Sequence, residues 1–333
     1  RRRAMPAAGV DAEVTAVAAK GVVKSGSRTR PAMDLSWRKQ ILVSGFSGTA
    51  AGGLTALLFC PFDVVRTNMA VHHIGNASGF GGRAAGGGIL STTRHVYARQ
   101  GFLGFYTGLG TTFVALAPNW GVYFATYKFT KEKCHEYMDS SFEESAVVHV
   151  ISAAFAAAVT DIAVNPAWLI KTRLQTQTYR SAPQQYTGIW NAFQTIVRTE
   201  GVLSLWRGLS AQLLGIGHVI IQFPMYEQLR KRFKGAKEEV SVTDTLMASS
   251  FSKVVASTCA YPHEVLRMRL YFQKDSDHQP YSGLRDAVKR ILKEEGMAGL
   301  YRGLSANLLR VIPATAVTFV AYEELSKRFN KYL

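Results

Sequence analysis

The sequence predicts an all-α membrane protein built from three tandem repeats of about 100 residues. The first observation is a proline motif that occurs once per repeat: Pro61-Phe-Asp63-Val-Val-Arg66, Pro166-Ala-Trp168-Leu-Ile-Lys171 and Pro262-His-Glu264-Val-Leu-Arg267. The second is a glycine motif that follows each proline, with seven residues from its first glycine to its last: Gly101 to Gly108, Gly201 to Gly208 and Gly296 to Gly303. The third is a hydrophobic fraction of 47% in a chain with a net charge of +16.

Each repeat predicts the same series of elements. An apolar helix carries the proline motif, a polar segment with a short amphipathic helix follows, and a second apolar helix begins after the glycine turn. Apolar stretches of this length can cross about 30 Å of hydrocarbon. The candidate membrane spans are residues 38–68, 109–133, 145–175, 209–230, 243–270 and 304–326. Lys253, Asp161 and Arg310 interrupt them, so we expect the helices to surround a polar cavity.

The segments outside these spans divide the chain. Residues 1–36 are basic and poor in acids, which predicts an organellar presequence or a disordered leader. The repeats are predicted at residues 37–138, 139–236 and 237–333. The glycine-rich segment 75–88 is interpreted as a flexible insertion, because a phosphate-binding loop would follow a strand and end in lysine. The three cysteines have no metal-like spacing and are predicted to be free thiols.

The positive charge has three interpretations. Binding of nucleic acid is disfavoured, because the basic residues flank apolar spans and form no stripe with interleaved aromatic residues. Attraction to an anionic membrane surface explains part of the charge. Attraction of an anionic solute into the cavity fits the internal Arg310 and Lys253. No nucleophile–base arrangement, metal-ligand cluster or cofactor loop is recognisable, so we expect no enzymatic activity, no cofactor and no metal.

The order of these elements resembles the mitochondrial carrier family, over essentially residues 37–333. The proline and glycine motifs carry the resemblance. It implies a six-helix barrel with threefold pseudosymmetry, three short helices on the matrix side and both termini on the cytosolic side. It also implies a multi-pass protein of the mitochondrial inner membrane, with peroxisomes and plastids as alternatives. Such a protein is expected to be a monomer in a lipid bilayer, with anionic lipids such as cardiolipin as candidate partners.

The resemblance implies a matrix gate formed by the proline motifs: Asp63, Arg66, Trp168, Lys171, Glu264 and Arg267. The acid of one repeat would pair with the base of the next, which gives Asp63 with Lys171 and Glu264 with Arg66. An exposed pair contributes only about 0–1 kcal/mol, which suits contacts that must break in each cycle. Trp168 stands where the third acid would be, so Arg267 lacks an acidic partner in the motif. Trp168 is expected either to offer its ring to Arg267 or to anchor the helix at the membrane interface.

A cytosolic gate is implied on the second helix of each repeat, where an aromatic residue precedes an acid and a base. Glu227 and Arg230 fit this pattern fully. Glu323 has no base in its motif and Lys131 has no acid, so we expect a weak cytosolic gate.

Internal symmetry locates the predicted solute contacts. Counting seven residues on from the last turn glycines gives Ala115, Gly215 and Arg310, and counting back from the tyrosines of the cytosolic gate adds Leu214. The family places its midplane contacts at these points. Arg310 suits a phosphate or carboxylate, with an interhelical ion pair as its structural alternative.

Further polar and aromatic residues extend this predicted site. Asn119 and Trp120 would hydrogen-bond and stack on a base. His218 would contact a ring or ribose, or pack in the core, and Lys253 would neutralise a second phosphate. Asp161 has no assigned role; a partner for Lys253 or Arg310 is one option.

The expected substrate is an anionic nucleotide. The second proline motif, with Trp168, looks like that of the carriers of NAD, FAD, folate and pyrimidine nucleotides. Segments 117–124 and 218–224 look most like those of the NAD carriers. The resemblance therefore implies exchange of NAD or a related nucleotide by alternating access. The alternatives are an FAD, folate or pyrimidine nucleotide carrier, and a proton-leak protein.

Overall fold

The computed structural model describes residues 35–75, 88–137, 146–179, 186–234, 242–272 and 281–332. Within these ranges the chain forms helices and turns and no strand, which confirms the all-α prediction for this part of the chain. The predicted leader and the glycine-rich insertion lie almost entirely outside the described residues.

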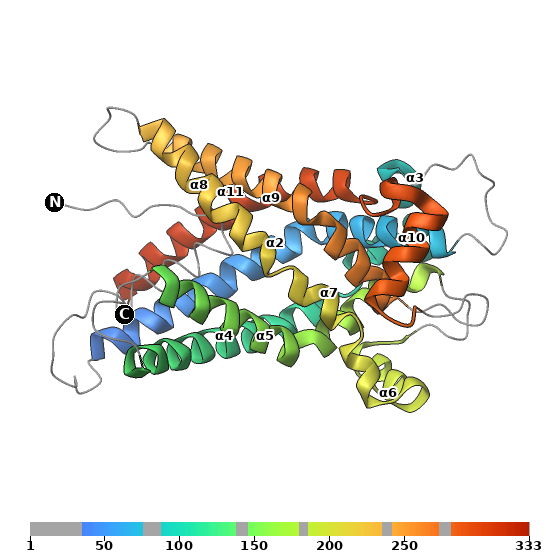
Figure 1. Cartoon of the computed structure of the whole chain (residues 1–333), viewed down its shortest axis with the longest axis horizontal. Coiled ribbons are helices and arrows are strands. Elements are labelled where there is room, and N and C mark those ends of the chain that lie inside the picture. Colours follow the sequence, from blue (N-terminus) through green and yellow to red (C-terminus); the bar gives the residue numbers. More distant parts are fainter. Residues whose placement is uncertain are drawn as a thin grey trace. The chain divides into compact units, whose positions relative to one another are not determined.

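The helices follow one another in the order that the repeats predict (Figure 1). The proline motifs lie in α2 (Leu35–Gly75), α5 (Ala146–Gln175) and α9 (Val242–Tyr271). The short amphipathic helices are α3 (Ile89–Gln100), α6 (Ile189–Glu200) and α10 (Leu284–Gly299). The second long helices are α4 (Leu109–Tyr137), α7 (Leu209–Leu214) with α8 (Gly217–Lys234), and α11 (Leu304–Tyr332). Short 3₁₀ helices are η2 (Phe102–Tyr106), η4 (Gln177–Tyr179) and η5 (Val202–Trp206).

Helices α2, α5 and α9 continue through the prolines of their motifs. Proline has no N–H, so each helix loses one backbone hydrogen bond at this point. The residue before the proline ties two of these helices to the glycine turn of the same repeat. Asn165 Nδ2 donates to the Leu205 carbonyl (2.7 Å), and Tyr261 Oη donates to the Arg302 carbonyl (3.2 Å). These contacts fix the turn against the proline position.

Each amphipathic helix buries the same face. The residues that face inward are spaced four apart in all three repeats: Thr92 and Val96, Ala192 and Ile196, and Ala287 and Ile291. This spacing places both residues on one side of a helix. The apolar residues of this face pack against the C-terminal part of the proline helix of their own repeat. Three apolar clusters result, one in each repeat, at equivalent positions. Burial of this face explains why a helix of only three to four turns forms here.

The glycines of the turn motif are required by the backbone. All six have positive φ: Gly101 (66°), Gly108 (82°), Gly201 (84°), Gly208 (79°), Gly296 (67°) and Gly303 (85°). Residues with a Cβ atom adopt this conformation at a cost of about 1 kcal/mol or more. The last glycine of each turn also touches another repeat. A Cβ atom on Gly208 would lie 2.7 Å from the Tyr271 ring, and one on Gly303 would lie 2.9 Å from the Arg66 carbonyl oxygen.

The predicted span 209–230 is interrupted, which corrects the sequence-based prediction of one continuous helix. Helix α7 ends at Leu214 and α8 begins at Gly217. The Gly215 N–H donates to the Gln212 carbonyl (2.9 Å), three residues back, which is tighter than an α-helix allows. Two glycines in four residues lower the helix propensity at this point. The side chain of His263 occupies the space beside Gly215, where a Cβ atom would lie 2.7 Å from Nε2.

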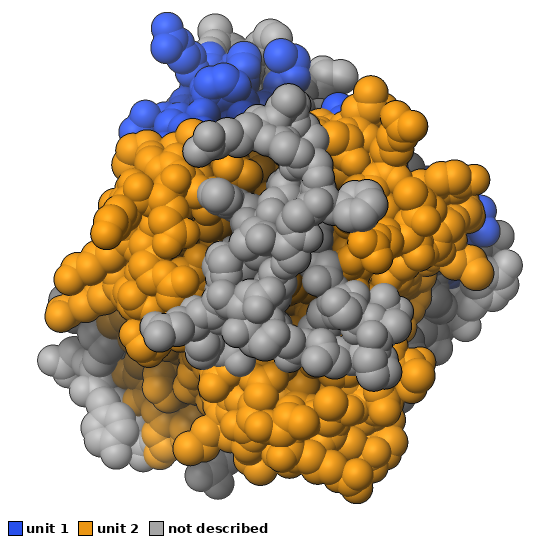
Figure 2. Space-filling model, turned by 90° about the vertical axis from the view of Figure 1, so that its right-hand side faces the viewer, with its two compact units in different colours: residues 1–59, 217–259, 308–333 blue, residues 60–216, 260–307 orange. Residues whose placement is uncertain are grey.

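The chain divides into two units, which Figure 2 colours separately. Unit 2 contains residues 60–216 and 260–307, and therefore the proline motifs, the glycine turns and the amphipathic helices. Unit 1 contains residues 1–59, 217–259 and 308–333. Within unit 1, Thr55 and Thr318 join α2 to α11 through a hydrogen bond of 2.6 Å, and Tyr226 packs against Ala248.

Two helical segments are long and apolar enough to cross a membrane by length and composition: Ala50–Val71 in α2 and Ile151–Gln175 in α5. The other predicted spans form helices but do not meet this criterion within the described residues. Charged residues in them lower their hydropathy, as the sequence indicated. The three cysteines, Cys60, Cys134 and Cys259, are free thiols, as predicted.

Candidate functional site

Two ion pairs join proline motifs of different repeats in unit 2. Lys171 Nζ lies 2.7 Å from Asp63 Oδ2, and Arg66 pairs with Glu264. Gln175 Nε2 donates to the same oxygen of Asp63 (3.3 Å) and so braces the first pair. The side chains of Lys171 and Asp63 are 14% and 19% exposed, so water screens this pair less than a surface pair. These are the two pairs that the family resemblance implies for the matrix gate.

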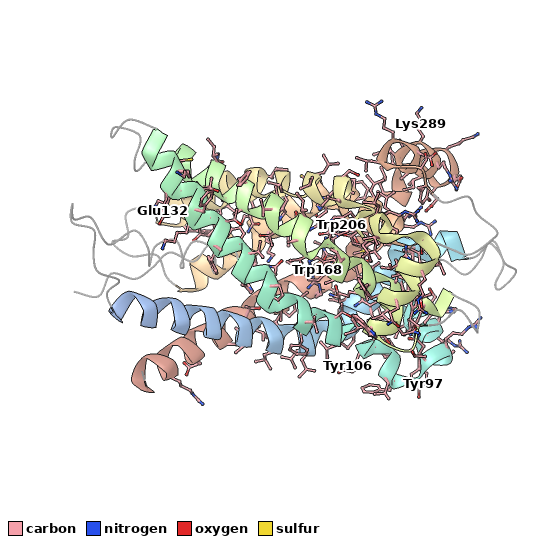
Figure 3. All side chains as sticks on the ribbon, turned by 90° about the horizontal axis from the view of Figure 1, so that it is seen from below. Tyr97, Tyr106, Glu132, Trp168, Trp206 and Lys289 are labelled. Carbon is pink, nitrogen blue, oxygen red and sulfur yellow. The ribbon has the colours of Figure 1, made fainter. Side chains whose placement is uncertain are left out.

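Trp168 contacts a cation of its own helix. Lys171 Nζ lies 5.1 Å from the centre of the Trp168 ring, close enough for a cation–π interaction. Lys171 follows three residues later on α5, so both side chains share one face. The expected cation was Arg267, which instead lies over the ring of Tyr271, 6.0 Å from its centre. Trp168 is labelled in Figure 3. A second labelled tryptophan, Trp206, also contacts α5, because its indole N–H donates to the Ile162 carbonyl (2.8 Å).

Arg267 and Asp161 are connected through a residue that the sequence-based prediction did not include. Arg267 Nη1 donates to Gln212 Oε1, and Gln212 Nε2 donates to Asp161 Oδ1 (2.9 Å). Asp161 thus has a defined partner, which is Gln212. All three side chains are half-buried.

A ring of three hydrogen bonds lies further along the proline helices of unit 2. In each, the residue seven positions after the proline donates to the backbone carbonyl nine positions after the proline of the next repeat. Asn68 Nδ2 donates to Gln175 (2.9 Å), Arg173 Nε to Tyr271 (3.0 Å) and Arg269 Nε to Ala70 (2.9 Å). The donors are at most 1% exposed. The first repeat therefore donates to the second, the second to the third and the third to the first. These hydrogen bonds join the C-terminal parts of the three proline helices in a ring.

The donors of this ring are held by carboxylates in the second and third repeats, whereas in the first repeat Thr178 Oγ1 donates to Asn68 Oδ1 (2.9 Å). Arg173 pairs with Glu200 and Arg269 with Glu295, and Arg207 and Arg302 bind the same carboxylates at 2.8 and 2.6 Å. The equivalent residues of the first repeat are Asn68, Gln100 and Thr107, and Thr107 Oγ1 lies 3.4 Å from Gln100 Oε1. The three positions that are charged in the second and third repeats are thus all neutral in the first. The sequence contains a signal for this ring: the donors lie seven residues after the prolines in all three repeats, and Gln100, Glu200 and Glu295 directly precede the first turn glycines.

The predicted solute contacts of unit 2 differ in exposure. Leu214 is 55% exposed, whereas Ala115 is 2% exposed. Asn119 and Trp120 are half-buried on α4, and the Trp120 ring stacks on Phe124 with centroids 5.6 Å apart. Gly215 lies against His263.

The predicted residues of unit 1 are His218, Lys253 and Arg310, and all three are half-buried. Of the residues predicted for a cytosolic gate, Lys131 is half-buried on α4. The side chains of Glu227, Arg230 and Glu323 lie outside the described part of the structure.

Comparison with known proteins agrees with this threefold arrangement. The family model described as "Mitochondrial carrier protein" matches residues 38–138, 142–237 and 238–333. The chain is 37% identical over 299 residues to the mitochondrial nicotinamide adenine dinucleotide transporter 2 of Arabidopsis thaliana, covering 88% of this chain and 81% of the relative. It is 32% identical to the mitochondrial nicotinamide adenine dinucleotide transporter 1 of Saccharomyces cerevisiae, over 92% of this chain and 84% of that protein. The chloroplastic folate transporter 1 of Arabidopsis thaliana is 33% identical, over 90% and 98%.

The three matched ranges correspond to the three repeats, and each range contains one proline motif and one glycine turn of this chain. The protein belongs to the mitochondrial carrier family.

Proposed function

We propose that this protein exchanges NAD or a related nucleotide across the mitochondrial inner membrane by alternating access. The carrying observation is the pair of breakable ion pairs between repeats, Asp63 with Lys171 and Arg66 with Glu264. They join helices that must separate when a path opens between the repeats. Relatives that are 37% and 32% identical and named as NAD transporters support the choice of substrate.

The gate would work through differential contacts in two states. In the state seen here, the two pairs hold the proline helices together. A solute bound at the predicted contact residues makes interactions that compensate for breaking the two ion pairs. The helices then rock apart around the bound solute. No bond of the solute is made or broken in this cycle, so the protein acts as a transporter without catalysis.

Arg310 and Lys253 would supply the charge for an anionic solute. A guanidinium binds a phosphate through two parallel hydrogen bonds, whereas an ammonium acts as a single point charge. Asn119 and Trp120 would contact the base by hydrogen bonding and stacking, beside Leu214 and Gly215. His218 would contact the ring or ribose. A dinucleotide offers both features, two phosphates and flat rings.

The surroundings follow from the same proposal. The protein would act as a monomer in the inner membrane, and anionic lipids such as cardiolipin would contact its basic matrix side. Lys131, Glu227, Arg230 and Glu323 would close the opposite, cytosolic side.

Uptake into proteoliposomes tests the substrate. Vesicles loaded with NAD are given labelled NAD outside, with unlabelled NAD, FAD, folate or pyrimidine triphosphates as competitors. We expect NAD to compete best. Stronger competition by folate or a pyrimidine nucleotide would reassign the substrate within the family. Proton conductance without any internal solute would support a leak protein instead.

Arg310→Ala tests the predicted anion contact. We expect uptake to fall by at least about tenfold, because a charge-assisted hydrogen bond contributes about 1.5–3 kcal/mol. Arg290→Ala is the matched control, since Arg290 lies on α10 and pairs there with Asp286 and Glu294. Equal uptake by both variants would remove Arg310 from the site.

A further inference from the structure

The matrix gate of this chain lacks one acid, yet Arg267 is still connected to the second repeat. In the two ion pairs, the residue two positions after one proline pairs with the residue five positions after another. By the same rule Arg267 would face Trp168, which carries no charge. The structure shows that Arg267 instead donates to Gln212, which donates to Asp161. A cation and an anion therefore stand at the two ends of one amide.

The geometry of α5 explains why an intermediate residue is needed. Asp161 precedes Trp168 by seven residues, about two turns, so both lie on nearly the same face of α5. The acid is displaced along the helix axis by about 10 Å from the missing position. A direct pair with Arg267 is thus replaced by one that passes through α7, where Gln212 lies.

A glutamine has the chemistry that this position requires. Arginine can only donate and an ionised carboxylate can only accept, so the residue between them must accept from one and donate to the other. The amide of Gln212 does both. Its two ends are assigned by its partners: Oε1 faces Arg267 and Nε2 faces Asp161.

The second repeat differs from the other two in the position of its acid. At the position of Asp161, five before the proline, the first and third repeats have Ala56 and Ser257. Only the second repeat has an acid there, and only the second lacks the acid two positions after the proline. The second repeat thus has its acid seven residues nearer the N-terminus of the proline helix than the other two repeats do.

Gln212 also lies close in the sequence to two predicted solute contacts, Leu214 and Gly215. It is two residues before Leu214, on the six-residue helix α7, which ends where the chain breaks at Gly215. A solute that presses on the end of α7 would displace Gln212 and release Arg267.

We propose that Asp161, Gln212 and Arg267 form the third contact of the matrix gate, with Gln212 as a positioning residue that couples it to the solute site. The proposal rests on the proposed transport function. It assigns a role to two residues, Asp161 and Gln212, that the proline motif does not include.

A double-mutant cycle between Gln212 and Trp168 tests this coupling. Gln212→Leu breaks the relay, whereas Trp168→Asp supplies a direct acid for Arg267 and makes the relay redundant. Each protein is measured for its unfolding temperature in detergent and its exchange rate in proteoliposomes. We expect Gln212→Leu to lower the unfolding temperature and to speed exchange about threefold in the natural background, the size of one modest hydrogen bond. In the Trp168→Asp background both effects should largely disappear.

Asp161→Ala should repeat the effect of Gln212→Leu and add little to it, because both remove the hydrogen bond between Gln212 and residue 161. Gln194→Leu on α6 is the matched control for loss of an amide. If Gln212→Leu has the same effect with and without Trp168→Asp, the relay is not a gate contact and the proposal fails. If the natural protein exchanges no nucleotide at all, the transport proposal fails instead, while the cycle in unfolding temperature still decides the relay.

Discussion

Arg269 Nε in the third repeat donates a hydrogen bond of 2.9 Å to the backbone carbonyl oxygen of Ala70 in the first. This bond closes the ring that Asn68 and Arg173 continue through the other two repeats. The two repeats are far apart in sequence, and the carbonyl acceptor depends on no particular side chain at position 70. The ring therefore joins the same proline helices as the two ion pairs proposed for the gate, and Gln175 takes part in both.

Arg269→Lys should destabilise the protein by about 1–3 kcal/mol, because hydrogen bonds to buried charged groups are lost. A lysine ammonium cannot reach Ala70 and also bind Glu295 through two parallel hydrogen bonds, as Arg269 does. The unfolding temperature in detergent measures the effect. Arg290→Lys, on the half-exposed face of α10, is the control and should change it little. Equal unfolding temperatures for the two variants would contradict the importance of the ring.

Asn68→Asp tests the neutral version of the ring in the first repeat. The Asn68 amide donates to the carbonyls of Val64 and Gln175, at 2.8 and 2.9 Å, and is fully buried. A carboxylate of the same shape would lose both donors and face two carbonyl oxygens, so we expect a severe loss of folded protein.

Asn191→Asp is the control for this substitution. The exposed Asn191 accepts from the Thr187 N–H through Oδ1, a bond that an aspartate retains. Yield and unfolding temperature of this variant should stay near those of the natural protein. Tolerance of Asn68→Asp would mean that its donors are not needed.

Gly208→Ala and Gly201→Ala separate backbone strain from steric clash. Both glycines have positive φ, 79° and 84°, but Gly208 is left-handed helical (ψ −2°), whereas Gly201 (ψ 163°) lies in a region that essentially only glycine adopts, so the backbone strain of alanine is larger at position 201. A Cβ atom at position 208 would also lie 2.7 Å from the Tyr271 ring, whereas position 201 is open. We expect the clash with the Tyr271 ring to outweigh the difference in strain, so the unfolding temperature should fall more for Gly208→Ala. Similar values would show that Tyr271 moves aside without cost.

Trp168→Asp should slow exchange by about two- to fivefold, because a third direct ion pair stabilises the closed gate by about 0.5–1 kcal/mol. The exchange rate in proteoliposomes measures this. Trp168→Phe keeps an aromatic ring beside Lys171 without adding a carboxylate, and should change the rate much less. An unaltered rate in Trp168→Asp would favour the interpretation of Trp168 as an interfacial anchor.

Much of this architecture is readable from the sequence because it repeats. A proline in an apolar stretch and two glycines seven residues apart are local signals, and each reflects a backbone requirement that holds wherever the segment lies. Three copies in phase raise that signal far above chance. The pairs Asp63–Lys171 and Arg66–Glu264 follow from the same symmetry once the family resemblance is known.

Other features depended on contacts between segments with no common pattern. The cation beside Trp168 is Lys171 because the two residues share a face of α5, while Arg267 is bound by Gln212 of another helix. Asp161 had no visible partner, because Gln212 lies 51 positions away and belongs to no motif. The helix break after Leu214 could not be predicted from the local sequence alone, because His263 of another helix packs beside Gly215.

The sequence by itself determined the three repeats, the helical class and the positions of prolines and turn glycines, since these follow from backbone conformation and local hydrophobic pattern. Only the tertiary structure decided which donor meets which acceptor: Arg269 with Ala70, and Arg267 with Asp161 through Gln212. Hydrogen bonds depend on distances of a few tenths of an ångström between atoms of different helices. Such distances are set by how the helices pack together, and no single segment contains them.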